Sequence, residues 1–294
     1  MILALGPRPI TSVKTEAPAA KEKDVTSEER APAGIDPSVA SVARIYDYWL
    51  GGKDNFASDR AAADKLLEYV PNAREMCREN RAFLTRTVSL LANEGVGQFL
   101  DIGSGLPTQD NTHQVAHRVN PGARVVYVDN DPIVLVHGRA LLEDNGHTRV
   151  VNGDVRDPAA LLADAEVTEL IDFSKPVAVL LLAILHFVSD DDEAAAIMAA
   201  IRSELVPGSY VVMTHGFPGE LQDDTLDSVR EVYAKTASGG VAGRSRAQIA
   251  SFFEGMEIID PGIVPSEAWR PDVPWDVPVD FTKHGVLGVV ARVR

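Results

Sequence analysis

The stretch Phe99-Leu-Asp-Ile-Gly-Ser-Gly-Leu-Pro-Thr108 decides how the rest of the chain is interpreted. Its apolar first half predicts a strand, which runs into a turn where Gly103 and Gly105 can adopt positive φ and leave the backbone open to a ligand. Ser104 lies between the two glycines. The carboxylate of Asp101 would repel a pyrophosphate and instead suits a donor-rich amino-acid group. The stretch therefore predicts a strand followed by a ligand-binding turn.

Downstream of this turn, short apolar segments alternate with amphipathic helical patterns. We predict strands at residues 99–102, 124–129, 149–152, 177–185, 209–214, 256–259 and 286–293. This alternation is typical of a mostly parallel sheet covered by helices on both faces. The fold class is therefore predicted as α/β.

The first 95 residues have a different character. Residues 1–35 mix Pro, Ala, Lys, Glu, Thr and Ser without periodicity, and we predict a disordered tail there. Residues 36–95 predict an N-terminal helical cap, with helices over 36–50, 58–69 and 72–93. Residues 96–294 then form the main domain.

Acidic residues end two further predicted strands. Asp129 closes the second strand, where its carboxylate can accept hydrogen bonds from both hydroxyls of a ribose. Asp154 follows the third strand and can reach the exocyclic amine of an adenine, and Val155 can pack on the adenine ring. Asn130 beside the ribose position and Leu185 at the end of the fourth strand complete the predicted set. Together with the glycine turn, these strand ends predict S-adenosylmethionine as the cofactor and disfavour a dinucleotide.

The same motifs carry a family resemblance. The segments Ala43-Arg-Ile-Tyr-Asp-Tyr-Trp-Leu-Gly-Gly-Lys-Asp-Asn-Phe56, Asp101-Ile-Gly-Ser-Gly-Leu-Pro-Thr108 and Leu182-Ala-Ile-Leu-His-Phe-Val188 resemble class I S-adenosylmethionine-dependent methyltransferases, and among them an actinobacterial family. The resemblance covers about residues 36–293. It implies a Rossmann-like, seven-stranded methyltransferase sheet with the last strand antiparallel, and cofactor binding by Gly103, Gly105, Asp129, Asp154 and Val155. Pro107 stands where the pattern often has a third glycine.

Two histidines are candidates for a general base. His186 follows the fourth predicted strand and His215 the fifth, so both are expected near the carboxyl ends of the parallel strands. A packed or capping histidine is the alternative at each position. The fourth strand does not end in the Asn/Asp-Pro-Pro-aromatic sequence of DNA amino methyltransferases, which argues against DNA modification.

Two segments are expected to shape the acceptor site. Tyr48, Lys53, Asp54 and Asn55 surround the Gly51-Gly52 pair and suit a lid, whereas Tyr46 and Trp49 are expected to pack on the sheet. The loop over residues 261–284 contains Trp269, Arg270 and Trp275, which suit either an acceptor pocket or a surface excursion.

Composition limits the class of partner. The 43 acidic residues outnumber 28 basic ones, for a formal net charge of -15, which argues against nucleic-acid or anionic-membrane partners and favours a small-molecule substrate. With Cys77 as the single cysteine, no intramolecular disulfide can form and no metal site is predicted. A reducing, cytoplasmic location is expected.

Two rival functions remain at this point. An NAD(P)-dependent oxidoreductase uses a related sheet, but its fingerprint requires Gly or Ala where this chain has Thr108. A non-catalytic protein that binds S-adenosylmethionine would share every motif above.

Overall fold

The computed structural model describes residues 35–143, 145–272 and 279–294, and these residues belong to one compact unit. The predicted tail lies outside the described residues except for its last residue. The helices are α1 (Val42–Leu50), α2 (Ala57–Tyr69), α3 (Ala73–Asn93), α4 (Thr112–Val119), α5 (Pro132–Leu142), α6 (Pro158–Ala163), α7 (Ala165–Leu170), α8 (Asp191–Ser203), α9 (Asp223–Tyr233) and α10 (Arg246–Ser251), with short 3-10 turns η1 (Leu185–Phe187) and η2 (Ser266–Ala268).

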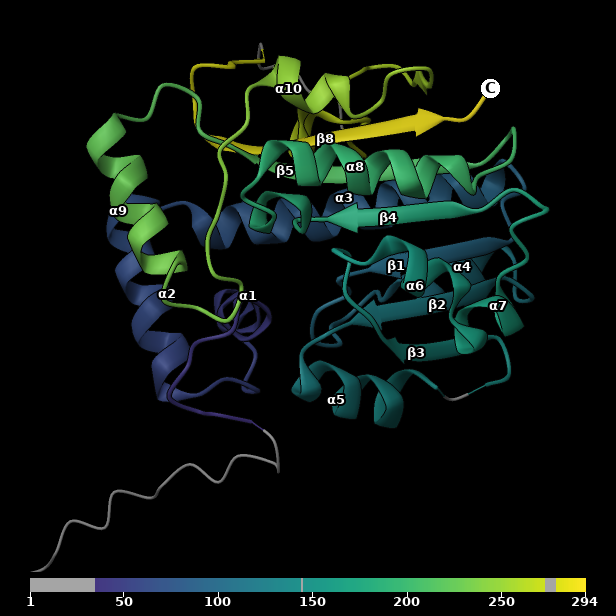
Figure 1. Ribbon diagram of the computed structural model, residues 1–294, viewed down its shortest axis with the longest axis horizontal. Coiled ribbons are helices and arrows are strands. Elements are labelled where there is room, and N and C mark those ends of the chain that lie inside the picture. Colours follow the sequence, from purple (N-terminus) through teal and green to yellow (C-terminus); the bar gives the residue numbers. More distant parts are fainter. Residues whose placement is uncertain (1–34, 144, 273–278) are drawn as a thin grey trace, which may run out of the picture. The chain divides into compact units, whose positions relative to one another are not determined.

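One sheet forms the centre of this unit (Figure 1). Its strands are β1 (Gln98–Ile102), β2 (Arg124–Asp129), β3 (Thr148–Asn152), β4 (Ala178–Leu182), β5 (Tyr210–Phe217), β6 (Glu257–Ile258), β7 (Val264–Pro265) and β8 (Gly285–Arg292). The order is β3-β2-β1-β4-β5-β8-β6, with the two-residue β7 also paired to β8. Strands β1 to β5 are parallel, and β8 runs antiparallel to β5. The predicted α/β class and the antiparallel last strand are confirmed.

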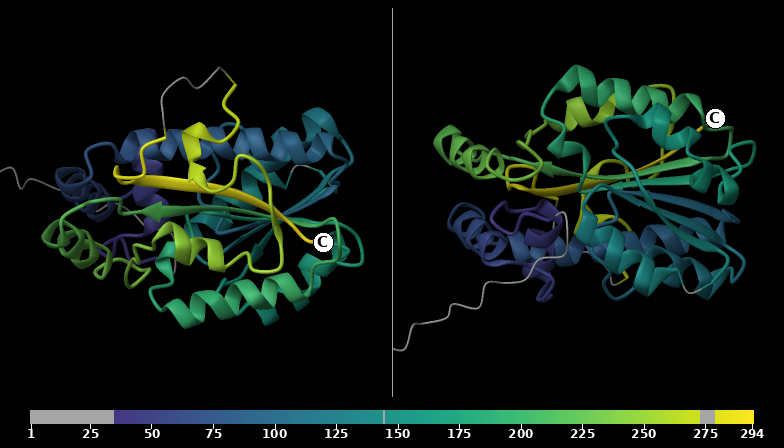
Figure 2. Two further views of the ribbon diagram at one scale, coloured as in Figure 1. Left: turned by 90° about the horizontal axis from the view of Figure 1, so that it is seen from above. Right: turned by 60° about the horizontal axis from the view of Figure 1, so that its bottom comes forward.

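Alternate side chains of each strand enter different core clusters. Leu100 packs in the cluster under α6, α7, α8 and α10, whereas Phe99 packs in the cluster under α3, α4 and η2. Helices α3 and α8 accordingly lie on opposite faces of the sheet (Figure 2). Both clusters consist mainly of aliphatic and aromatic side chains, which is what a parallel sheet buried on two faces requires.

Helices α1, α2 and α9 lie beyond the carboxyl ends of the parallel strands (Figure 1). Helix α1 begins at Val42, later than predicted, because the Asp36 carboxylate accepts hydrogen bonds from the Ser38 amide and hydroxyl and holds residues 36–40 in a turn. Gly51 ends α1 at φ 86°, as expected. Across the described ranges, the helices lack the combination of length and apolarity that spanning a bilayer requires.

The fourth strand is shorter than predicted. It ends at Leu182, because Ala183 adopts φ 57° and turns its amide toward the Thr214 hydroxyl at 2.8 Å. The apolar residues up to Leu185 continue into η1. The chain thereby turns away from the sheet and brings His186 to the strand ends.

Candidate functional site

One continuous pocket of about 340 Å³ opens at the carboxyl ends of β1, β2 and β4. Its volume is within the range of small-molecule sites. The structure brings most of the predicted cofactor residues together in the pocket lining, namely Asp101, Gly103, Ser104, Gly105, Asp129, Asn130, Asp154 and Val155. Of the two candidate bases, His186 lines the pocket and His215 does not.

The glycine turn and the end of β2 are joined directly. The Gly105 amide donates to Asp129 Oδ2 at 2.9 Å, and the Asp131 amide donates to Asp129 Oδ1 at 2.9 Å. Gly105 has φ 66° and open space where a Cβ would lie, so the backbone there is accessible to a ligand. Burial raises the pKa of Asp129 to about 6. Each carboxylate oxygen retains a lone pair, so this group can still accept hydrogen bonds from a ribose.

An anion and a cation line the pocket beyond β1. The buried Asp101 accepts a hydrogen bond from the Thr112 hydroxyl at 2.7 Å, and burial raises its pKa, opposed by the nearby charge of Arg81. Arg81, on α3, donates through Nη2 to the Asp110 carbonyl oxygen at 3.0 Å. Its Nε is buried and has no hydrogen-bond partner among the described residues. A carboxylate beside a guanidinium suits an amino acid in its zwitterionic form.

Asp154 lies at the rim of the pocket. Its Oδ2 accepts hydrogen bonds from Asn130 Nδ2 at 3.0 Å and Arg156 Nη1 at 3.3 Å. Val155 packs against the core cluster beneath it while also lining the pocket. A flat apolar surface beside a polar edge is the arrangement that a purine base requires.

The two histidines have different environments. The Gly216 amide donates to His186 Nδ1 at 3.2 Å, which places the ring proton on Nε2. His215 is fully buried, and its Nε2 accepts a hydrogen bond from Arg244 Nη1 at 3.1 Å while its Nδ1 donates to the Gly216 carbonyl oxygen. Burial lowers the pKa of His215 to about 4. Both ring nitrogens of His215 are hydrogen-bonded within the protein, as in the packed alternative, and neither is free to accept a proton.

Arg244 is a residue that sequence reasoning missed. It is 1% exposed, and each of its guanidinium nitrogens donates to the segment that carries His186 or to its neighbours. The acceptors are Asp191 Oδ1, the carbonyl oxygens of Leu185, Val188 and Asp190, and His215 Nε2. No local pattern marks it, because its partners lie 29 to 59 residues away.

The predicted lid residues do not line the pocket. The Tyr48 hydroxyl donates to Asp64 Oδ1 on α2 at 3.2 Å, and Lys53 is exposed. Asn55 Nδ2 donates to Asp47 Oδ2 at 2.9 Å. The Asp47 carboxylate fills the space where a Cβ at Gly52 would lie, so residues 51–56 form a turn built around Asp47.

Two other predicted residues lie in the core instead of the pocket. Trp269 is fully buried on the α3 face of the sheet, with its ring 5.4 Å from Phe83 in an edge-on contact. Leu185 is fully buried in the cluster on the opposite face. Both therefore contribute to packing. Trp275 lies outside the described residues.

Tyr46 and Trp49 line the pocket, whereas the sequence predicted contacts with the sheet. They pack with α2 and α3 in a separate cluster. Asn80 Nδ2 donates to the Tyr46 hydroxyl at 2.9 Å, and the Thr214 hydroxyl donates to Asn80 Oδ1 at 2.7 Å. This relay ties α1 and α3 to the middle of β5.

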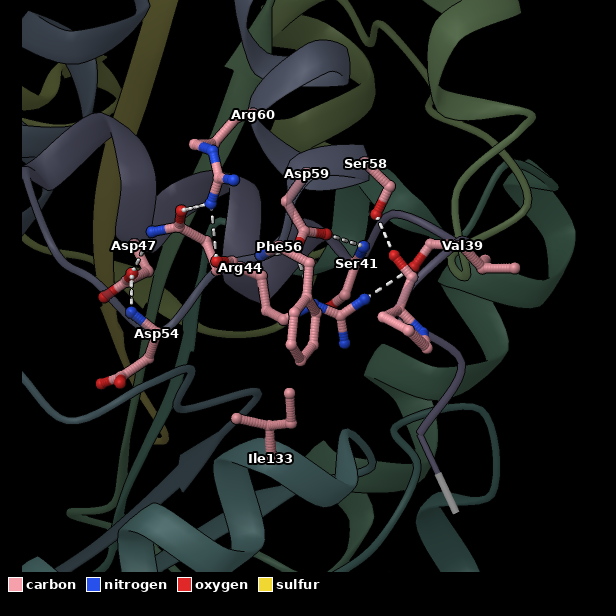
Figure 3. Close-up of polar contacts among 12 residues, drawn as sticks. Val39, Ser41, Arg44, Asp47, Asp54, Phe56, Ser58, Asp59, Arg60 and Ile133 are labelled. Atoms are coloured by element: carbon pink, nitrogen blue, oxygen red, sulfur yellow. Dashed lines mark hydrogen bonds and ion pairs between the residues drawn. The ribbon is translucent and has the colours of Figure 1, made fainter. Parts of the chain in front are cut away.

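A buried ion pair holds the N-terminal helices to the cofactor side of the pocket (Figure 3). Arg44 Nε lies 2.8 Å from Asp59 Oδ2, and Arg44 Nη1 lies 3.4 Å from Asp131 Oδ2. The guanidinium lies over the Phe56 ring, which packs with Ile133 in a small cluster that also contains Leu106. We call Arg44, Asp59 and Asp131 the clasp.

Comparison with known proteins adds to this geometry. A family model described as S-adenosyl methyltransferase matches residues 28–294. The chain is similar to a candidate methyltransferase from Thermobifida fusca YX, with 42% identity, a TM-score of 0.83, and coverage of 90% of this chain and 98% of that one. It is also similar to a DUF574 family protein from Streptomyces avermitilis MA-4680, with 40% identity, a TM-score of 0.80, and coverage of 88% and 99%. None of the curated proteins matches the chain. Both structural matches extend over the N-terminal helices as well as the sheet.

Proposed function

Because the chain belongs to the S-adenosyl methyltransferase family, we propose that it methylates a small-molecule acceptor by in-line displacement, in the pocket described above. Because the chain belongs to this family, its cofactor is S-adenosylmethionine, and the alternative of an NAD(P)-dependent oxidoreductase is excluded. When bound, this cofactor supplies a methyl group already activated on a sulfonium. The protein then has to align the acceptor and exclude water.

The observation that carries the proposal is the continuity of the pocket. The same cavity touches Asp129 and Gly105 at one side and Tyr46, Phe187 and Tyr233 at another. Cofactor and acceptor can therefore meet inside one cavity. Its limited volume favours an acceptor of metabolite size over a macromolecule.

We assign the cofactor residues as follows. Asp129 accepts hydrogen bonds from the ribose, Asp154 and Asn130 bind the adenine edge, and Val155 packs on the ring. The Gly103-Ser104-Gly105 backbone passes beside the methionine portion. Asp101 binds its amino group, and Arg81, which lines the same pocket, binds its carboxylate.

Transfer of a labelled methyl group tests the acceptor class. The full-length protein is incubated with methyl-labelled S-adenosylmethionine and a cell extract divided by ultrafiltration. We expect label in products of the low-molecular-mass fraction, and an Asp129→Ala variant serves as the cofactor-site control. Label that moves only into retained protein or nucleic acid would contradict the small-molecule assignment.

The Arg81 assignment has its own test. Arg81→Gln should weaken binding of S-adenosylhomocysteine about tenfold or more, because a charge-assisted hydrogen bond is lost. Binding of 5′-methylthioadenosine, which lacks the amino-acid portion, should be unchanged. Arg78→Gln on the exposed face of α3 is the matched control. Calorimetry with both ligands measures the difference, and equal weakening of both would count against a carboxylate contact.

A further inference from the structure

The part of the pocket away from the cofactor residues is predominantly apolar. We call it the acceptor chamber and define it by Tyr46, Trp49, Met76, Phe187, Leu226 and Tyr233. Its walls come from α1, α3, η1 and α9. An acceptor that fits there must bury a largely apolar body.

The polar groups around this chamber differ in whether they have partners within the protein, and Trp49 Nε1 is buried with no hydrogen-bond partner among the described residues. The Tyr46 hydroxyl donates to the Cys77 carbonyl oxygen at 3.0 Å and accepts from Asn80. Asn80 Oδ1 in turn accepts a hydrogen bond from the Thr214 hydroxyl. Neither His186 Nε2 nor the Tyr233 hydroxyl has a hydrogen bond to another described residue, and neither atom is sealed from solvent. The Phe187 ring contacts both of these rings, with its centroid 4.3 Å from that of His186 and 5.5 Å from that of Tyr233.

His186 lines the same pocket and carries a hydrogen-bond donor. Because the Gly216 amide occupies Nδ1, the neutral ring carries its proton on Nε2. To accept a proton at Nε2, the ring would first have to move its own proton to Nδ1, where this N–H would face the Gly216 amide N–H. Protonation at Nε2 would then give a cation beside Arg244 and His215. Asp191, the acid paired with Arg244, is bonded to that guanidinium at 2.8 Å. The imidazole is therefore held as a hydrogen-bond donor.

The carboxylates that line the pocket already have hydrogen-bond partners within the protein. Asp101 binds Thr112, Asp129 binds two backbone amides, and Asp154 binds Asn130 and Arg156. Asp47 accepts from the Asp54 amide and from Asn55. None of the six residues that define the acceptor chamber carries a carboxylate or an imidazole. Besides His186, the described pocket lining contains His284, whose Nε2 donates to Asn72 Oδ1 at 2.8 Å.

From this arrangement we propose that the acceptor is a largely apolar molecule that enters with its oxygen already ionised and places that oxygen on His186 Nε2–H. The inference rests on the proposed function and names its substrate class: an acidic phenol, an enol or a carboxylic acid on an apolar body. The acceptor oxygen gives an electron pair to the methyl carbon as the sulfur–carbon bond breaks with its pair onto sulfur, and no proton moves in the site. An anion beside a sulfonium forms a neutral pair, so the low dielectric of the chamber favours their approach.

Binding of 4-nitrophenol, whose ionised form absorbs visible light, tests this inference. The probe is titrated into the full-length protein saturated with sinefungin, which carries an ammonium group near the sulfonium position, or with S-adenosylhomocysteine, whose thioether sulfur is uncharged. We expect the ionised form to bind, with a lower apparent pKa of the bound probe in the sinefungin complex. Benzoate tests whether an ionised carboxylic acid binds in the same way. Nitrobenzene, which has no ionisable group, and benzylamine, which is a cation, should bind at least about tenfold more weakly than the ionised probes.

Two variants separate a donor from a base. His186→Gln keeps an N–H in reach of the chamber and an oxygen for the Gly216 amide, so binding of the ionised probe should stay within about threefold. His186→Phe removes the donor and should weaken it about tenfold or more. Equal binding by both variants, preference for the protonated phenol, or tighter binding of benzylamine would overturn the inference.

Two further measurements keep the test decisive, namely cofactor binding by each variant and the position of the proton on the His186 ring. Calorimetry with sinefungin on each variant shows that the site is intact, and failure of the wild-type protein to bind it would refute the proposed function instead. If His186→Phe does not fold, nitrogen-15 spectra of the wild-type protein still report the tautomer. A proton on Nε2 supports the inference, and a proton on Nδ1 would refute it.

Discussion

At the scale of single residues, Asp129 couples the cofactor site to pH. Its side chain is buried at the end of β2 with only backbone amides as partners, so burial raises its pKa to about 6. The folded state thus holds this proton more tightly than the unfolded chain does. The contribution of Asp129 to the free energy of unfolding therefore falls as pH rises from 3.8 to about 6.

Cofactor affinity should change in the opposite direction. Ribose hydroxyls donate to the ionised carboxylate, so S-adenosylhomocysteine should bind about tenfold more weakly at pH 5 than at pH 7. Calorimetric titration across this range measures the slope. Asp129→Asn should bind more weakly at pH 7 and lose that part of the pH dependence. An unchanged slope in this variant would assign the titration to another group.

At the scale of elements, the clasp fixes α1 and α2 beside the cofactor turn. Arg44 and Asp59 are 4% and 0% exposed, so removing the cation leaves a buried carboxylate without its partner. We expect Arg44→Met to lower the free energy of unfolding by about 3 kcal/mol. Lys65→Met breaks an exposed Lys65–Glu68 pair in the same helical region and should cost about 0.5 kcal/mol or less.

Urea unfolding of Arg44→Met and Lys65→Met measures the difference between their free energies of unfolding. The clasp also reaches Asp131, whose amide donates to Asp129, so Arg44→Met should weaken binding of S-adenosylhomocysteine as well. Lys65→Met should leave that affinity unchanged. Equal losses of stability in the two variants would mean that the Arg44 pair contributes no more than a surface ion pair.

The elements also show which parts of the structure a sequence can predict. The strands and the acidic residues at their ends were predictable because side-chain alternation is local and parallel strands bring their carboxyl ends together. The burial of Trp269 in the core was not predictable, because its contact with Phe83 joins segments far apart in the chain. The same holds for His215, whose role depends on Arg244. Arg81 carried no local signal on an otherwise amphipathic helix.

At the scale of the whole molecule, the pocket depends on two groups of elements. The sheet supplies the cofactor residues, and α1, α3 and α9 supply the walls of the acceptor chamber. The clasp and the relay through Asn80 connect the two groups. A ligand that contacts both should therefore stabilise them together.

Hydrogen exchange with S-adenosylhomocysteine measures this coupling. Opening of α1 would disrupt the bound site, so a ligand at 100 times its Kd adds about 2.7 kcal/mol to that opening and slows exchange of the α1 amides about 100-fold. Residues 103–106 should be protected similarly, whereas α7, which contributes no residue to the pocket lining, should be unchanged. Protection confined to the glycine turn would show that α1 opens independently of the cofactor. In that case the N-terminal helices would form a separate cover over the site, and cofactor binding alone would not close the acceptor chamber.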